Sequence, residues 1–244
     1  MSLPLIIPNW AAPQQVKACM TTRVGGVSSA PYESLNLGDH VQDDPASVAK
    51  NRAVLSENLP AEPIWLTQIH STRVVEAATY NIGAEADASY TDQPNVVSCV
   101  MTADCLPVLF CDAAGTQVAA AHAGWRGLLD GILEATLGTF PNPNSVMVWF
   151  GAAIGPEVFE VGEEVRDAFV AAHEPSGQYF KPKDNGKFLA DIYGLARFRL
   201  ELAGVKSESI YGGDLCTVSD ESQFFSFRRD GQTGRMATCI WLES

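Results

Sequence analysis

The stretch MTADCLPVLFCDAAGTQVAAAHAGWRG, residues 101–127, contains two apolar runs separated by a short turn. Residues 105–111 and 116–122 each have the composition of a strand, and the turn sequence DAAG between them predicts a hairpin. Cys105 and His122 then lie at the same open end of that hairpin. Since facing residues of paired strands lie about 5 Å apart, we expect these two side chains to share a metal ion or a proton.

The residues next to this hairpin refine the prediction. Pro107 has no backbone N–H, so we expect the strand 105–111 at a sheet edge or at a bulge. After the second strand, residues 123–127 lead into one helix with an apolar stripe that reaches Leu137. His122 therefore comes just before a helix N-terminus, where free N–H groups attract anions.

Elsewhere in the chain, predicted strands outnumber predicted helices. Further strands are expected at 16–22, 64–70, 72–78, 86–91, 96–101 and 145–150, with a hairpin of 223–229 and 235–242. Helices are expected from Asp44-Pro45 onward, in a segment ending near 173, and at 191–202, where Asp191 caps and Gly204 terminates the helix. Recurring hairpins, and no repeat or linker, predict a single domain over residues 1–244, an α+β fold with mostly antiparallel sheets and flanking helices.

Composition limits the function classes. The 244 residues have a net charge of −13, which argues against binding nucleic acid polymers or anionic membranes but permits a small anionic substrate held by local arginines. No run approaches the roughly 20 apolar residues of a membrane helix, and the first residues include no basic leader, so we expect a cytoplasmic protein. Six cysteines without a CxxC pair are expected to be reduced thiols. No heptad run is present, and a monomer is expected.

A third candidate ligand, His70, ends the apolar run IWLTQIH. Together with Cys105 and His122 it makes a His2Cys set that suits zinc and leaves a fourth position open, the pattern of catalytic zinc sites. A second interpretation needs no metal: Cys105 is a nucleophile and His122 its base, oriented by Asp104 or another acid. In a third interpretation the three residues are structural: Cys105 is a buried thiol, and the two histidines make ordinary hydrogen bonds. We expect such ordinary hydrogen bonding of the remaining histidines, His40 and His173.

Several polar residues are candidates for binding substrate. Arg126 follows the histidine closely and can clamp a phosphate or carboxylate, or else pair with Asp130. Arg23 and Asn36 lie in predicted loops, where binding groups concentrate, although a solvated arginine and a turn asparagine are the simpler interpretation.

Other candidates lie nearer the ends of predicted strands. Gln68 lies two residues before the histidine, on the same face of a strand. Asp87 either accepts a hydrogen bond from one of the metal-binding residues or is an acidic residue of a turn. A basic cluster includes Arg228, Arg229 and Arg235, and the sequence does not tell which of these face the site.

Eight segments resemble, in the same order, the bacterial YfiH proteins of the laccase-domain family. They are CMTTRVGGVS, YESLNLG, WLTQIHS, ADASYT, VMTADCLPVLF, AAAHAGWRG, IGPEVFEVG and FFSFRRDGQTGRMA, and they span nearly the whole chain. The resemblance implies a roughly four-layer α/β/β/α sandwich in one domain. It also implies a zinc held by two histidines and a cysteine, which match His70, Cys105 and His122.

The resemblance further implies a purine nucleoside phosphorylase acting on adenosine, inosine, guanosine and S-methyl-5′-thioadenosine, with adenosine deaminase activity. Its ligands would be nucleoside and phosphate. Our own hypothesis for the phosphate cradle is Arg126 with the adjacent helix start, helped by Arg23 or Arg229. No glutamate adjoins the ligands, so Asp104 or the Cys105 thiolate is the candidate proton carrier.

Three alternative functions stay open beside this one. They are a copper-dependent polyphenol oxidase, a peptidoglycan-editing amidase acting on nucleotide-linked muramic acid, and a binding module without catalysis. A multicopper oxidase is the least compatible with the composition, because four histidines are few for several coppers. Zinc is therefore the expected metal, with copper as the alternative.

Overall fold

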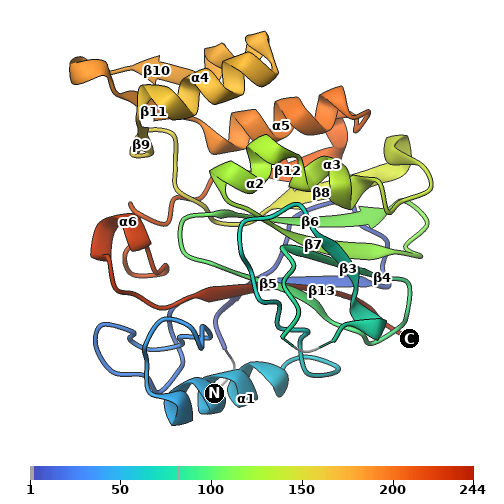
Figure 1. The fold of residues 1–244 in the computed structure, drawn as a ribbon. Helices are drawn as coiled ribbons and strands as arrows, with labels where there is room; N and C mark the ends of the chain where they lie inside the picture. Colours follow the sequence, from blue (N-terminus) through green and yellow to red (C-terminus); the bar gives the residue numbers. More distant parts are fainter. Residues whose placement is uncertain (1–2, 82) are drawn as a thin grey trace.

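Two stacked β-sheets form the centre of the protein in the computed structural model, which describes residues 3–81 and 83–244 (Figure 1). The first sheet has the strand order β1 (Leu5–Ile6), β2 (Val16–Thr21), β13 (Met236–Leu242), β5 (Ser98–Thr102). The second has the order β12 (Ile210–Gly212), β8 (Val146–Phe150), β6 (Leu106–Asp112), β7 (Val118–Ala123), β4 (Ala88–Thr91), β3 (Val74–Glu76). Most strand pairs are antiparallel, as predicted, and β3–β4 and β8–β12 are parallel.

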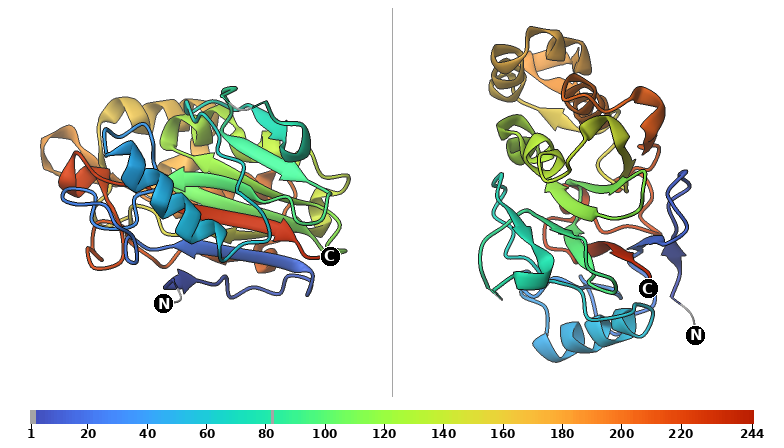
Figure 2. Two further views of the ribbon diagram at one scale, coloured as in Figure 1. Left: turned by 90° about the horizontal axis from the view of Figure 1, so that it is seen from below. Right: turned by 90° about the vertical axis from the view of Figure 1, so that its right-hand side faces the viewer.

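Helices cover the outer faces of both sheets. The first sheet is covered by α1 (Pro45–Ser56), and the second by α2 (Trp125–Asp130), α3 (Ile132–Leu137) and α5 (Ile192–Leu202), as the edge-on view of Figure 2 shows. Beyond these, α4 (Glu163–Ala172) packs with a small sheet of β10 (Phe180–Pro182), β11 (Phe188–Ala190) and β9 (Glu160–Val161), and α6 (Phe227–Asp230) lies beside the end of the two large sheets (Figure 1). Short 3-10 turns occupy Ala77–Thr79, Pro143–Ser145, Glu174–Tyr179, Asp184–Gly186 and Ser207–Ser209. The expected α/β/β/α layering is confirmed.

Burial explains why the central strands have almost no polar alternation. Apolar side chains pack between the two sheets, between the second sheet and its helices, and between the first sheet and α1. Strands β5, β6 and β7 are therefore buried on both faces along nearly their whole length. Strands enclosed in this way have continuous apolar sequences, as the runs around Cys105 and His122 do.

The central hairpin forms as predicted, whereas the expectation for Pro107 was wrong. Pro107 lies opposite His122 in the β6–β7 pair, but β6 is an interior strand between β7 and β8. The register places Gly151, just past β8, opposite Pro107 on the other side. The Tyr193 hydroxyl lies 3.1 Å from the Gly151 carbonyl and 2.8 Å from that of Leu215, so its single proton is shared between these two acceptors and reaches the carbonyl that proline leaves without a donor. An interior proline is thus accommodated by a tertiary contact.

The segment 64–70 is not the strand that its apolar run predicts. Only isolated bridges occur there, at Ile64 and Thr67, and the following segment contributes only β3. The reason is local: His70 has a left-handed backbone with φ of 62°, and the N–H groups around it bind the side chain of Asp87 rather than a neighbouring strand.

Two further predictions were wrong near helices. The helix predicted after the hairpin is divided into α2 and α3 at Gly131, which has φ of 102°. The C-terminal hairpin does not form, because the Ser226 hydroxyl caps α6 by accepting from the N–H of Arg229 at 3.2 Å, and β13 pairs with β2 and β5 instead. The predicted helix caps Asp44 and Asp191 are confirmed. Within the described residues, the helices are all too short or too polar to span a bilayer.

Candidate metal centre

Three side chains from separate segments converge at the open end of the central hairpin. Cys105 immediately precedes β6, His122 lies on β7, and His70 comes from the loop before β3; their ligand atoms all lie within 4.8 Å of one another. The Sγ atom of Cys105 is 3.7 Å from Nε2 of His70, and the two imidazole rings are 4.7 Å apart at 70°. The structure thus brings together the set that the sequence singled out.

The carboxylate of Asp87 holds both histidines in place. It is fully buried, and its Oδ1 atom accepts from the backbone N–H of His70 at 2.9 Å and from Nδ1 of His122 at 2.8 Å. Its Oδ2 atom accepts from the N–H groups of Ile69 and Ser71 and from the Ser71 hydroxyl. Because Nδ1 of His122 donates to this carboxylate, Nε2 is the nitrogen left to bind a metal.

The electrostatics of the group favour an ionised thiol. Burial alone would raise the pKa of Cys105, but the imidazoles of His122 and His70 outweigh it and lower the pKa to about 6. Burial likewise opposes the charged form of His122, yet Cys105 and Asp87 raise its pKa to about 9. Without a metal, the proton therefore resides on the imidazole, opposite a thiolate. A thiolate with two imidazoles is a donor set that fits zinc or copper.

A glycine leaves the space that this group needs. Gly124 precedes α2, and a Cβ atom placed on it would lie 2.5 Å from Cδ2 of His70 and 3.1 Å from Sγ of Cys105. Its backbone φ of −65° is one that any residue adopts. Glycine is thus required here because the two ligand side chains occupy the position of a side chain.

The three side chains face a cavity of about 460 Å³, within the ~300–1,000 Å³ range of small-molecule sites. Its lining combines an apolar wall with basic groups, and Asp104 is the carboxylate among the described lining residues. The apolar wall includes Trp125, Ile154, Phe159, Ile192 and Phe227, and the basic groups outside the metal-binding set are His40, Arg126, Arg228 and Arg235.

The three lining arginines are held differently. Arg126 lies over the ring of Trp125 at 4.4 Å, and the described chain places no carboxylate within ion-pair distance of it, so the alternative pairing with Asp130 does not form. Arg228 donates to the backbone carbonyl of Glu160 at 2.8 Å. Arg235 donates to two backbone carbonyls close to it in sequence. None of these contacts neutralises the guanidinium charges.

The structure places three predicted binding residues outside the cavity lining. The guanidinium groups of Arg23 and Arg229 donate to backbone carbonyls of neighbouring loops, and the buried amide of Asn36 bonds to backbone and to an aspartate. In this structure the three side chains hold neighbouring loops in place, and their role in binding substrate stays a prediction. Gln68 does line the cavity, but its side-chain amide is already paired: its NH2 group donates to the carbonyl of Met101, and its oxygen accepts from the N–H of Met101.

Asp104 lines the cavity without orienting a histidine, so of the two alternatives given above, Asp104 or another acid, the structure supports the second. It has a left-handed backbone with φ of 86°, and its carboxylate accepts from the Thr217 hydroxyl and from the N–H of Arg228, both at 2.6 Å. The acid that orients His122 is Asp87 instead. His40, expected to have an ordinary role, proves to be a lining residue, and no pattern in the sequence around it indicated this.

The chain is similar to several known proteins over almost its whole length. Residues 17–243 match the family described as multi-copper polyphenol oxidoreductase laccase. The chain is 54% identical over 240 residues to a purine nucleoside phosphorylase of Pseudomonas aeruginosa, covering 98% of each protein. It is 53% identical over 242 residues to the purine nucleoside phosphorylase YfiH of Escherichia coli, again covering 98% of each. The crystal structure of a Neisseria meningitidis protein, 50% identical, superposes with a TM-score of 0.94, covering 98% of this chain and 99% of that one.

Proposed function

This chain belongs to the multi-copper polyphenol oxidoreductase laccase family, in its YfiH-type branch, and from that membership we propose that it is a metal-dependent purine nucleoside phosphorylase. It would cleave the bond between ribose and purine with inorganic phosphate, releasing the free base and ribose 1-phosphate. The observation that supports this most is the joint lining of one cavity by the His-Cys-His group and by three arginines. The two relatives that this chain matches over 98% of their length are named as purine nucleoside phosphorylases.

The proposed metal is zinc, with copper as the alternative, and His70, Cys105 and His122 would hold it. When bound, such an ion supplies a Lewis acid to the cavity. The buried carboxylate of Asp87 keeps both imidazoles oriented toward the ion.

The arginines of the cavity would bind the phosphate. Arg126, Arg228 and Arg235 approach from three different segments of the chain. Guanidinium groups bind oxyanions through paired N–H donors, and this local positive charge overcomes the repulsion expected from a net charge of −13. Arg228 and Arg235 thus take the place that the sequence analysis gave to Arg23 or Arg229 beside Arg126.

We extend the proposal to the individual substrates adenosine, inosine, guanosine and S-methyl-5′-thioadenosine, and to deamination of adenosine. Deamination needs a group that moves a proton. Asp104 and Cys105 are the candidates in the lining, and the Asp104 carboxylate already accepts two hydrogen bonds. Because Cys105 would be occupied by the metal, Asp104 is the one of the two left to carry a proton in the loaded protein.

The family description raises the possibility of a polyphenol oxidase, which needs ligands for several coppers. Residues 3–81 and 83–244 contain one group of three or more converging His, Cys, Asp or Glu ligands. That group suffices for a single ion, so a multicopper electron relay is not supported by the ligand inventory.

The test is a product assay on purified, zinc-loaded protein. Adenosine with phosphate should yield adenine and ribose 1-phosphate. Omitting phosphate should stop the release of adenine but should not affect deamination of adenosine to inosine. His122→Ala should abolish turnover, whereas His173→Ala, which alters a histidine outside the cavity, should not. Parallel incubations with a phenol and with a nucleotide-linked muramic acid carrying a wrong amino acid test the two alternatives. A fully loaded wild-type protein that turns over no nucleoside would refute the proposal.

A further inference from the structure

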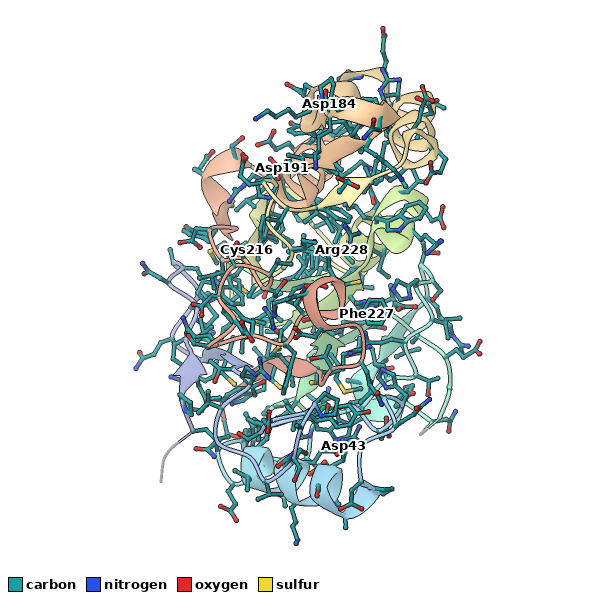
Figure 3. The ribbon with its side chains drawn as sticks, turned by 90° about the vertical axis from the view of Figure 1, so that its left-hand side faces the viewer. Asp43, Asp184, Asp191, Cys216, Phe227 and Arg228 are labelled. Atoms are coloured by element: carbon teal, nitrogen blue, oxygen red, sulfur yellow. The ribbon has the colours of Figure 1, made fainter. Side chains whose placement is uncertain are left out.

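Phe227 is an exposed aromatic ring on the wall of the metal cavity. It is 60% exposed, whereas Phe224 and Phe225, just before it in the chain, are completely buried. Figure 3 shows it on α6, at the side of the molecule where the two sheets end. A phenylalanine ring left in water forgoes the stabilisation that burial gives, and ligand cavities are lined largely by apolar and aromatic side chains of this kind.

The segment that carries this ring is held firmly. The backbone N–H of Arg228 donates to Asp104 at 2.6 Å, and the Arg228 side chain donates to Glu160. The Arg229 side chain donates to three backbone carbonyls and pairs with Asp230. The side chains of Arg229 and Asp230 are thus engaged within the protein. The α6 side chains that line the cavity are Arg228, assigned above to phosphate, and the exposed ring of Phe227.

The surroundings of the ring indicate what kind of ligand would cover it. The apolar part of the lining includes Ile154, Phe159 and Ile192, while the metal ligands and Arg126 make the rest polar. A phosphate has no apolar face, and a ribose offers a benzene ring only a few C–H groups. A nucleobase offers a larger matching face, because any base presents a flat π-surface and a polar edge.

We propose that Phe227 stacks on the purine base of the substrate and thereby selects a flat aromatic leaving group. This inference rests on the proposed function and names the residue that recognises the base. Phe227 would act in binding, and the metal ligands and arginines would bind the remainder of the substrates.

The decisive experiment compares Phe227→Ala, Phe227→Leu and Phe227→Trp with wild-type protein. Removing a base-stacking ring should raise KM for inosine roughly tenfold or more in the alanine variant, with little change in kcat and none in KM for phosphate. Leucine keeps apolar bulk without a π-face and should be nearly as weak as alanine, whereas tryptophan should restore tight binding. Leu202→Ala is the matched control, because Leu202 is also 60% exposed but lies on α5, outside the cavity lining.

Calorimetric binding without turnover separates the base from the sugar. Inosine alone should bind the Phe227→Ala protein more weakly than wild type, and ribose 1-phosphate should bind both equally. Equal inosine KM and affinity in wild type and Phe227→Ala, or an equal loss for ribose 1-phosphate, would overturn the stacking proposal. Wild-type protein that neither binds nor converts any nucleoside would instead overturn the proposed function itself. Circular dichroism and metal content verify that each variant is folded and loaded.

Discussion

Replacing Asp87 with asparagine tests whether the buried carboxylate builds the metal site. In wild type, its two oxygens accept five hydrogen bonds from His122, His70, Ile69 and Ser71. Asparagine has nearly the same shape but only one acceptor oxygen. Either orientation of its amide turns an NH2 group toward at least two of those donors.

The expected size of the effect follows from this count. A buried donor without an acceptor costs about 1–3 kcal/mol, so two of them destabilise the fold by roughly 2–6 kcal/mol. In a chain of this length that lowers Tm by at least about 4 °C. Loss of the carboxylate partner of a metal-binding histidine lowers metal affinity by about 10- to 100-fold. Both effects should appear in Asp87→Asn.

The assay is competition for zinc against a chromophoric chelator, with calorimetry for stability. Asp112→Asn is the control, because Asp112 is likewise a hydrogen-bond acceptor, taking three bonds from Thr116 and Gln117, but at the opposite end of the same hairpin. It should lose stability and keep its zinc affinity. If Asp87→Asn bound zinc as tightly as wild type, Asp87 would not be the residue that orients the ligands.

Three further predictions concern the same region. In metal-free protein the thiolate absorbance of Cys105 should titrate near pH 6, because its pKa is lowered to about 6, and a midpoint near the ordinary ~8.5 would contradict the ion pair. Zinc affinity should fall as pH drops through about 9, where His122 takes up a proton, and more steeply through about 6, where Cys105 does. Gly124→Ala should reduce zinc binding while leaving the fold intact, since the new methyl group lies 2.5 Å from the His70 ring; unchanged affinity would show that the ring has room to move. Tyr193→Phe should lower stability by roughly 2–6 kcal/mol, measured by urea unfolding, because the buried Ala153 N–H and one carbonyl, that of Gly151 or of Leu215, lose their partner; its zinc affinity should match wild type, and unaltered stability would refute the account of Pro107.

The part of the site formed by the central hairpin could be predicted from the sequence. A turn between two apolar runs determines which residues face each other, so Cys105 and His122 were placed at one end without knowledge of other contacts. Both runs are continuous because the strands are buried on both faces, and this pattern also indicated a layered sheet protein.

The remainder depended on contacts between distant segments. The apolar run ending at His70 predicts a strand, yet its N–H groups bind Asp87, seventeen residues later in the chain. Arg228 and Arg229 are adjacent and chemically identical, but α6 directs one into the cavity lining and the other toward backbone carbonyls. The tertiary fold determines which of two adjacent residues faces the cavity, and the local sequence pattern does not carry that information.

The central claim is that one metal ion is bound by two imidazoles and one thiolate, and zinc K-edge X-ray absorption tests it most directly. The account predicts one sulfur at about 2.3 Å with nitrogen or oxygen neighbours at about 2.0–2.1 Å in wild-type protein. It further predicts that the sulfur contribution disappears in Cys105→Ser and persists in Cys216→Ser, whose thiol lies outside the group. A wild-type spectrum without sulfur, or one in which Cys105→Ser retains it, would contradict the assignment.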